Sequence, residues 1–463
     1  MVTMAFSLFT AVVSHPDSCH LDDINESPYG TTVTYGYEIW TLEDLFNISM
    51  DLDGQYTLMT DIDASATFEP SSDFWYGGRG WMPIDSFRGK LDGNGKNIDG
   101  LFINRSGLSY VGLFGYFGPD AVVENINLLN FNVTGYESVG ALAGYNHQGR
   151  ISNCTAHGDV AGNNYVGGLV GYNMGGSINN CEVNVNVAGD YSLGGLTGFS
   201  YSGQITDCIA FGNVDATNGM VGGLMGQNDH STVDNCESHG DVTGYYAVGG
   251  LIGSNHGFSS FNQATGDVSG REMVGGLVGY NGYGIIAGSH AMGNINGDLM
   301  VGGLIGSNSG SVEYCYAHGN VTGNESVGGL IGKNDFSGCI IDSYSIGMVM
   351  GDIRGGGLVG FNLGISSNSF WDKETSGMLT SPAGIGKTTA EMKEGSTFIE
   401  AGWNFEVLWQ MTDGETYPFH REQIIIPIGE NVADDSDYVS IGMITISALI
   451  ILVTLIRRAR RRR

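Results

Sequence analysis

The sequence contains few charged residues, and basic residues are the scarcest of them. Asp, Glu, Lys and Arg make up 15% of the 463 residues, and 19 basic residues stand against 49 acidic ones, for a formal net charge of −30. Six of the basic residues lie in the last seven positions, so the rest of the chain is more acidic still. Such a surface keeps a protein soluble, favours cationic partners and repels anionic polymers. We therefore expect no nucleic-acid partner.

The sequence also lacks the signatures of common catalytic and metal sites. It contains no HExxH, no nucleophile elbow and no Ser/His/Asp signature. Its cysteines show no CxxC and no Cys/His spacing of the kind that binds zinc. We therefore expect no catalytic residue, no cofactor and no metal centre.

The apolar residues show no pattern at the helical period. Instead, the sequence contains a repeated hexapeptide. It is clearest at Val166–Gly171 (VGGLVG), and close copies recur between Val111 and Gly360 at steps of 26 to 29 residues. Between the copies lie apolar, β-branched runs of about four to six residues, separated by glycine and asparagine, as expected for short strands and turns. A fixed period of this size predicts a solenoid.

The repeat unit predicts a right-handed parallel β-helix. Three strands and three turns make one coil of about 27 residues, and about ten coils stack with their strands in parallel, about 4.8 Å apart. Val166 and Leu169 are three residues apart, so both can face the interior only if Gly167 and Gly168 form a bulge or bend. We expect one of these glycines to have a positive φ or to lie too close to the next coil for a Cβ.

An asparagine follows the hexapeptide at a fixed distance, two residues after the closing glycine, with Ser200 as the exception in the nine full copies. Asparagine tolerates the left-handed conformation of a corner, and its amide can bind the same amide one coil along. We interpret the row as a structural asparagine ladder. Its members are Asn146, Asn173, Asn228, Asn255, Asn281, Asn308, Asn334 and Asn362.

Four cysteines share another repeat position: Cys154, Cys181, Cys208 and Cys236. Stacked coils bring their Cα atoms within disulfide range, but parallel stacking points the side chains alongside one another. We interpret the stack as small buried side chains that fill a narrow corner, with disulfides as the alternative. The position continues as Asn262, Ser289, Cys315 and Ser343.

A catalytic role is the alternative, because parallel β-helices also include polysaccharide lyases and glycosidases. These enzymes use paired carboxylates or Ca²⁺-binding acids, so the candidate residues are acidic. The candidates share one repeat position, where Asp241 and Asp267 are expected to be neighbours one coil apart. Because the position recurs and alternates with asparagine, we interpret it as a turn residue, and we interpret a recurring histidine in the same way. The residues are Asp159, Asp241, Asp267, Asn213, Asn294 and Asn320, and the histidines are His157, His239 and His318.

These repeats resemble the GLUG-repeat family of microbial surface proteins, named for the G-G-L-x-G pattern, over about Leu101 to Trp371. The flanks are similar too: DGQYTLMTDID from Asp53 resembles a lead-in coil, and SFWDKETSG from Ser369 resembles a closing segment. The resemblance implies a β-helical, surface-displayed, adhesin-like module, found alone or beside unrelated catalytic domains. It implies no particular ligand.

Two patterns compete in the stretch after the array. Gly384–Thr389 (GIGKTT) resembles part of a phosphate-binding loop, but Ser381 stands where that loop requires its first glycine. Thr389–Ala401 instead predicts a short amphipathic helix. Its Met392, Phe398 and Ile399 are expected to pack on the terminal coil and to hide the open strand edges.

The two ends of the chain indicate export. Val439–Ile456 is 18 residues long without a charge, about 27 Å as a helix, and arginines follow it from Arg457. This predicts a single-pass transmembrane helix with a cytoplasmic C-terminus, with a buried helix as the alternative. The first fourteen residues are short and apolar like a secretory signal, although no basic region precedes them, which leaves an ordinary strand as the alternative.

The sequence thus predicts an all-β parallel β-helix with one C-terminal transmembrane helix, in a non-enzymatic protein of the cell membrane with most of its chain outside. Its expected role is structural or adhesive, towards an unidentified cell-surface polymer or protein, and a cell-surface carbohydrate-active enzyme is the alternative. The expected segments are a signal peptide (1–14), lead-in coils and cap (15–100), the GLUG-repeat β-helix (101–370), a closing segment (371–428), an acidic spacer (429–438), the transmembrane helix (439–456) and a basic tail (457–463).

Overall fold

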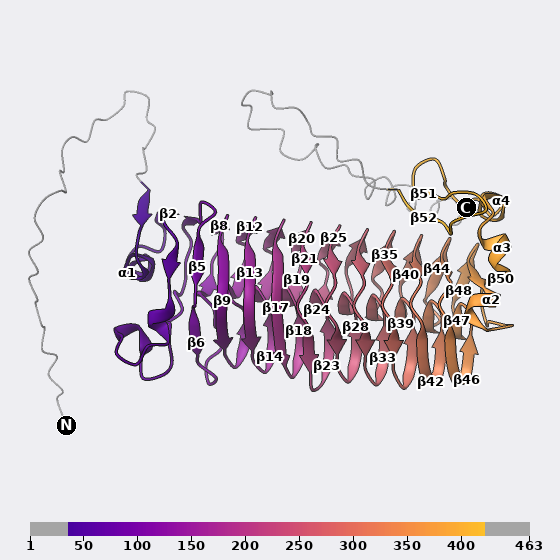
Figure 1. Cartoon of the computed structure of the whole chain (residues 1–463), viewed down its shortest axis with the longest axis horizontal. Helices are drawn as coiled ribbons and strands as arrows, with labels where there is room; N and C mark the ends of the chain where they lie inside the picture. Colours follow the sequence, from indigo (N-terminus) through magenta and orange to yellow (C-terminus); the bar gives the residue numbers. More distant parts are fainter. Residues whose placement is uncertain (1–35, 422–463) are drawn as a thin grey trace, which may run out of the picture. The chain divides into compact units, whose positions relative to one another are not determined.

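The computed structural model describes residues 36–421, and these residues form one stack of β-coils (Figure 1). Their strands make three long sheets, and every recorded strand pair within these sheets is parallel. We call them sheet A (13 strands), sheet B (27 strands) and sheet C (ten strands). The described chain is therefore a right-handed parallel β-solenoid of about ten turns, as the 27-residue step predicts.

The strands of sheets A and C are short and evenly spaced along the chain. Sheet A contains β1 (Tyr37–Ile39), β2 (Gln55–Leu58), β4 (Lys90–Asp92), β8 (Val122–Glu124), β12 (Arg150–Ser152), β16 (Ser177–Asn179), β20 (Gln204–Thr206), β25 (Thr232–Asp234), β30 (Phe258–Ser260), β35 (Ile285–Ala287), β40 (Ser311–Glu313), β44 (Cys339–Ile341) and β48 (Ile365–Ser367). Sheet C contains β7 (Phe114–Phe117), β11 (Ala143–His147), β15 (Val170–Met174), β19 (Thr197–Tyr201), β24 (Met225–Asp229), β29 (Ile252–Asn255), β34 (Val278–Asn281), β39 (Ile305–Asn308), β43 (Ile331–Asn334) and β47 (Val359–Asn362).

Sheet B receives several strands from each coil. It contains β3 (Ile62–Asp63), β5 (Asn97–Asp99), β6 (Phe102–Asn104), β9 (Asn127–Thr134), β10 (Glu137–Val139), β13 (Thr155–Ala161), β14 (Asn164–Gly167), β17 (Glu182–Gly189), β18 (Tyr191–Gly194), β21 (Ile209–Ala210), β22 (Val214–Ala216), β23 (Gly219–Gly222), β26 (Glu237–Ser238), β27 (Val242–Thr243), β28 (Tyr246–Gly249), β31 (Gln263–Ala264), β32 (Val268–Ser269), β33 (Glu272–Gly275), β36 (His290–Ala291), β37 (Ile295–Asn296), β38 (Leu299–Gly302), β41 (Tyr316–Ala317), β42 (Val321–Gly328), β45 (Tyr344–Ser345), β46 (Val349–Gly356), β49 (Phe370–Asp372) and β50 (Ile385–Lys387). A coil therefore has four or five short strands, where the sequence predicted three.

One coil shows how the repeat is used. From β14 the chain turns into β15 of sheet C, continues through β16 of sheet A and returns to sheet B as β17. Each strand pairs in register with its copy in the next coil, as in Val170↔Thr197 and Ile178↔Ile205. The inward side chains of successive coils form one continuous apolar cluster from Ile39 to Trp371. A single repeat could not bury these apolar side chains alone, so the coils depend on stacking for their stability.

The hexapeptide is the corner between sheets B and C. β14 ends at Gly167, β15 begins at Val170, and Gly168 and Leu169 form the bend between them, with Val166 and Leu169 fully buried. Neither Gly167 nor Gly168 has a positive φ. A Cβ on Gly168 would instead overlap the carbonyl oxygen of Gly195 in the next coil. The double glycine therefore permits the close approach of adjacent coils.

Two rows of left-handed residues run along the solenoid, one mostly inside the sheet B strands that lead into the hexapeptide and one at the corner between sheets A and B. The residue before each hexapeptide has φ between 50° and 59°, and the residue before each position of the cysteine row has φ between 47° and 58°. The first row is Tyr110, Ser138, Tyr165, Ser192, Met220, Ala247, Met273, Met300, Ser326 and Arg354. The second is Asn125, Asn153, Asn180, Asp207, Asn235, Phe261, Gly288, Tyr314, Asp342 and Asn368. The stacking of equivalent positions holds a conformation that most of these residue types avoid when isolated.

Short helices lie before and after the stack. Before it come α1 (Leu42–Phe46), whose first turn is closed by a capping box from Thr41 to Asp44, and three 3-10 turns. After it come α2 (Lys373–Ser376), α3 (Thr389–Met392), α4 (Gly395–Ile399) and the antiparallel pair β51 (Trp409–Gln410) and β52 (Phe419–His420). The 3-10 turns are Asn47–Met50, Ser65–Thr67 and Asp73–Trp75.

The predicted helix at Thr389–Ala401 is wrong in two respects. It is split into α3 and α4. Met392 and Phe398 are buried as predicted, on the outer face of sheet B with Tyr344 and with Phe370 of the last coil. Ile399 is 59% exposed. The closing segment thus covers part of the outer face of sheet B in addition to extending that sheet with β50.

The predicted fold class needs a correction at the C-terminus. Among residues 36–421, no helix is long and apolar enough to cross a membrane, and the longest helices, α1 and α4, each have five residues. The segment 439–456, where the sequence predicted a transmembrane helix, lies outside the described residues, as does the predicted signal at 1–14. Within residues 36–421 the fold is therefore an all-β solenoid with short flanking helices.

Candidate functional site

The asparagine row lies inside the solenoid at the corner between sheets C and A. Asn281 is typical: its Nδ2 donates to the carbonyl of Gly284 in its own turn (3.1 Å) and to Oδ1 of Asn308 in the next coil (2.8 Å). Equivalent bonds of 2.8 to 2.9 Å join Asn146 to Asn173, Asn228 to Asn255, Asn255 to Asn281, Asn308 to Asn334 and Asn334 to Asn362. None of these asparagines has a positive φ. Their amides bind one another and the turns, so they hold coils together and face no ligand.

Ser200 interrupts the row without breaking the chain of hydrogen bonds. Asn173 donates to the Ser200 hydroxyl at 3.1 Å, and that hydroxyl lies 2.9 Å from the hydroxyl of Ser231 in the following coil. Ser231 is buried, and its hydroxyl also accepts from the backbone N–H of Gly203. Two serines therefore replace one asparagine at this level.

The cysteine row is buried at the corner between sheets A and B. Cys154, Cys181, Cys208 and Cys236 are free thiols and are at most 2% exposed. Contact with Cys181, together with burial, raises the pKa of the Cys154 thiol well above its ordinary value. The row continues with polar side chains that accept from the coil before, as Asn262 does from the backbone N–H of Cys236 (2.7 Å). The raised pKa values of Cys154, Cys181 and Cys208 and the burial of the row suit packing and not nucleophilic chemistry.

The residues at the acidic turn position stack in successive coils along the solenoid axis. Their side chains accept hydrogen bonds from backbone N–H groups of the next coil. Oδ1 of Asp241 accepts from the backbone N–H of Asp267 (2.9 Å), and Oδ1 of Asp267 accepts from that of Asn294 (2.7 Å). Asn213 does the same for Asp241. Each side chain is exposed and satisfies the turn of the next coil, so the row is one of repeated turn residues.

The recurring histidines share the outer face of sheet B without forming a cluster. His239 lies near Thr265 and Glu237, whereas His318 lies three coils away near Tyr344. Among residues 36–421, no group of three or more His, Cys, Asp or Glu side chains is placed to hold a metal ion.

A row of aromatic rings runs along the outside of sheet C, and the sequence analysis missed it. Tyr116, Tyr145, Tyr172 and Phe199 occupy one register position in four successive coils, with ring centroids 5.4, 5.0 and 4.7 Å apart. We call these four residues the tyrosine row. Its signal was present in the repeat, because each member directly follows the closing glycine of a hexapeptide.

The hydrogen-bond partners of the tyrosine row are uncharged side chains. Tyr116 Oη lies 2.6 Å from His147 Nδ1, and Tyr145 Oη donates to Met174 Sδ at 2.8 Å. Burial and the neighbouring tyrosines raise the pKa of Tyr172 to about 12, so its hydroxyl remains a donor. The same register position continues to the end of the solenoid without a carboxylate, as Gln227, Ser254, Tyr280, Ser307, Lys333 and Phe361.

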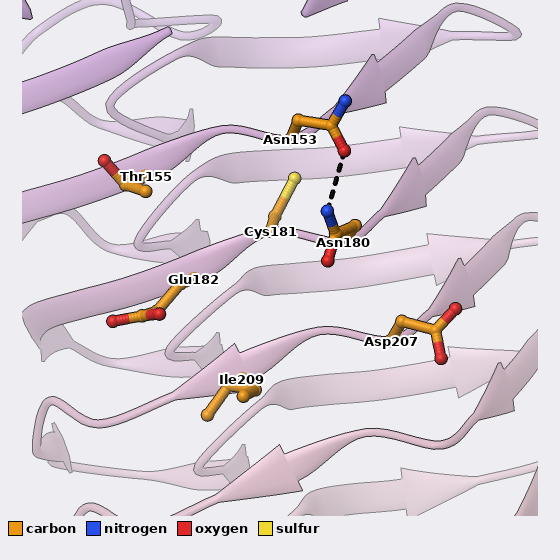
Figure 2. A pocket seen from close by; sticks show the side chains of 7 residues that line it. All are labelled: Asn153, Thr155, Asn180, Cys181, Glu182, Asp207 and Ile209. Atoms are coloured by element: carbon orange, nitrogen blue, oxygen red, sulfur yellow. Dashed lines mark hydrogen bonds between the residues drawn. The ribbon is translucent and has the colours of Figure 1, made fainter. Parts of the chain in front are cut away.

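A shallow pocket of about 250 Å³ opens on the outside of the corner between sheets A and B (Figure 2). Left-handed corner residues form one side, where Asn180 Nδ2 donates to Asn153 Oδ1 at 2.7 Å. Two carboxylates, Glu182 and Asp207, complete a polar lining. The full lining is Asn153, Thr155, Asn180, Cys181, Glu182, Asp207 and Ile209. It has room for a small polar group.

Comparison with known families identifies the repeat itself. The family described as the GLUG motif matches residues 135–161, 162–188, 270–296 and 297–322, and each match spans one coil. The chain carries GLUG repeats. The second match, for example, begins just before β14 and ends in β17, so a GLUG repeat is one full turn of the solenoid.

Two curated proteins are similar to part of this chain. Halomucin of Haloquadratum walsbyi is 43% identical over 134 residues, which are 27% of this chain and 1% of that protein. A protein provisionally named a Gly-rich membrane protein, from Evansella cellulosilytica, is 38% identical over 120 residues, or 24% of this chain and 13% of that protein. The chain therefore spans only a small part of the relatives that it matches.

A solved structure resembles the chain more distantly. It is a protein from Bacteroides ovatus provisionally identified as an immunoglobulin A1 protease, with 19% sequence identity and a TM-score of 0.39 over 84% of this chain and 93% of that one. At this TM-score the similarity gives no information about the function of the GLUG-repeat chain.

Proposed function

We propose that this chain is a non-enzymatic cell-surface protein whose GLUG-repeat solenoid binds a surface polymer or another surface protein. The surface location is supported by the names of the two relatives, a halomucin and a membrane protein. The binding role is supported by the tyrosine row, an uncharged aromatic strip on a chain with a net charge of −30.

The tyrosine row has the properties of a preorganised contact face. Tyrosine offers a large amphipathic area at a low cost in side-chain entropy. Mutual stacking and contacts with His147 and Met174 already fix these rings, so little order is lost when a partner binds. Tyr110 and Tyr201 extend the surface at its margin and are exposed. Binding by repetition on a stiff support is thus the role that we assign to the solenoid.

The alternative, a carbohydrate-active enzyme, has weaker support. Its candidate acids, Asp241 and Asp267, cap backbone N–H groups of neighbouring turns. Glu182 and Asp207 line an open, shallow pocket, in which Asp207 also accepts from Asn235. Product analysis on the same polymers that are tested for binding would separate the two functions, because cleavage products that disappear in Glu182→Gln or Asp207→Asn would favour the enzyme.

The binding test uses the full chain on an array of immobilised polysaccharides and surface proteins. We expect the combined variant Tyr116→Ser, Tyr145→Ser and Tyr172→Ser to lose at least about tenfold in affinity, about 1.4 kcal/mol, for the polymer that the unaltered chain binds. Tyr280→Ser, at the same register position but outside the row, is the matched control. Equal binding by both variants, with unchanged circular dichroism, would exclude the tyrosine row as the contact face.

A further inference from the structure

The end of the closing segment lies against the outside of sheet B as a strap, which we define as residues 403–420 (Figure 1). The strap contributes Trp403, Leu408 and Trp409 to an aromatic cluster whose other side is Tyr316 and Tyr344 of the solenoid. This cluster is separate from the continuous core of the coils. The strap can therefore leave sheet B without opening the interior of the solenoid.

Three histidines sit in the contact between strap and sheet. His290 stacks on Tyr316 with ring centroids 4.6 Å apart and an angle of 8°. His420 comes from the strap, and its ring lies 5.1 Å from Tyr316 and 5.9 Å from His290. His318 lies 4.8 Å from Tyr316 on the sheet side. The histidines thus meet around one tyrosine, at half-buried positions.

The polar anchors of the strap place a proton on Nε2 of His318 and of His420. Tyr344 Oη donates its single proton to the carbonyl of Pro418 (2.5 Å), so His318 Nε2, at 2.9 Å, must donate to Tyr344. His420 Nε2 lies 2.8 Å from the carbonyl of Tyr314 and donates to it. Both sides of the strap are therefore held through histidine N–H groups.

No counter-charge is recorded for these histidines among residues 36–421. The groups around them are the rings of Tyr316, Tyr417 and Trp409, the hydroxyl of Tyr344 and the backbone carbonyl of Tyr314. Charged groups lie at the margin: Asp372 accepts from Tyr417 Oη, Lys393 lies over the Tyr417 ring, and Arg421 donates to the carbonyl of Phe405. Positive charge on His420 or His318 would oppose a proton on His290.

We propose that the strap is an acid-released clasp: protonation of His290, His318 and His420 detaches residues 403–420 and uncovers the aromatic outer face of sheet B. Burial, with the other histidines nearby, lowers the pKa of His290 to about 3, and burial lowers the pKa values of His318 and His420 to about 4. The docked strap also leaves the indole N–H of Trp409 buried without a hydrogen-bond partner, which weakens the closed state.

The direction of the pH effect follows from these lowered pKa values. A histidine with a pKa depressed by docking supports the docked state fully above its ordinary pKa of about 6.5 and loses that support as the pH falls towards about 4. At pH 5, each histidine released from a pKa of about 4 favours the open strap by about 30-fold. We therefore expect release between about pH 6.5 and about pH 4.5.

Hydrogen–deuterium exchange of the full chain, with labelling times scaled to the intrinsic rate at each pH, tests the clasp. We expect peptides from residues 403–420 to lose protection in this pH range while peptides from residues 166–187 keep theirs. The combined variant His290→Gln, His318→Gln and His420→Gln should keep the strap closed at pH 4.5. His239→Gln, at the register position of His318, should release like the unaltered chain.

Three results would overturn the proposal: a strap that stays protected to pH 4.5, a strap and coils that lose protection together, or release of the combined variant at the unaltered pH. If the combined variant is already open at pH 7.5, the three single variants decide. Each must lower the release pH, because one titrating group has been removed. An unchanged release pH in all three would contradict the clasp.

Discussion

Asn281 donates through Nδ2 to Oδ1 of Asn308, one coil along, while its own Oδ1 accepts from Nδ2 of Asn255, one coil back. Each amide in the interior thus depends on the two beside it. Loss of one member leaves a buried donor on one side and a buried acceptor on the other. Such groups are costly because no water replaces the missing partner.

Asn281→Ala should therefore lower the free energy of unfolding by about 2 to 4 kcal/mol, the cost of two unsatisfied buried groups. Asn184→Ala is a suitable control, because Asn184 is an exposed residue of β17. Its effect should stay within about 0.5 kcal/mol. Urea unfolding followed by circular dichroism measures both. Equal midpoints would mean that the asparagine ladder adds nothing to stability.

Gly168→Val should be among the most damaging single changes in the array. A side chain there meets the carbonyl oxygen of Gly195, and the coils must separate locally to admit it. We expect a loss of about 3 kcal/mol or more, spread over adjacent coils. Limited proteolysis should cut the variant between coils. Asp159→Asn is the control, since Asn186 already occupies that register position one coil along, and a variant Gly168→Val as resistant as this control would refute the close-contact explanation.

The buried thiols should be unreactive in the folded chain. Burial and contact between thiols raise the pKa values of Cys154, Cys181 and Cys208 well above the ordinary value, so the thiolate is scarce at pH 8. A thiol reagent at pH 8 should label these residues only after unfolding in urea, as measured by mass spectrometry of their peptides. Rapid labelling of Cys208 in the folded chain would show that the corner opens to solvent.

Local regularity explains what could be predicted from the sequence. The period of the hexapeptide defines the coil, and the bend at Gly168 and Leu169 follows from the need to bury Val166 and Leu169 together. The fixed offset of the asparagines places them at one corner, because a parallel stack repeats every position. These inferences rest on neighbours in the repeat and on no distant contact.

Other features had no such local signal. The left-handed row before the hexapeptide includes Tyr165, Met273 and Arg354, which share no chemical property. The strap reaches sheet B through Pro418 on Tyr344 and His420 on Tyr314, contacts that span 74 and 106 residues. Apolar side chains after the array therefore indicated that a cover exists, but not which surface it covers.

The contact made by Gly168 recurs down the array: a Cβ on Gly250, Gly276 or Gly303 would meet the carbonyl of Gly276, Gly303 or Gly329 in turn. The contact surface between one coil and the next is therefore the same at each of these steps. A gene segment that encodes one whole coil can be duplicated or deleted by recombination, and the new neighbours meet at the same contact between glycine and carbonyl. A single-residue insertion inside the hexapeptide has no such neutral outcome. The length of this solenoid is thus free to evolve in whole turns, while its cross-section stays fixed.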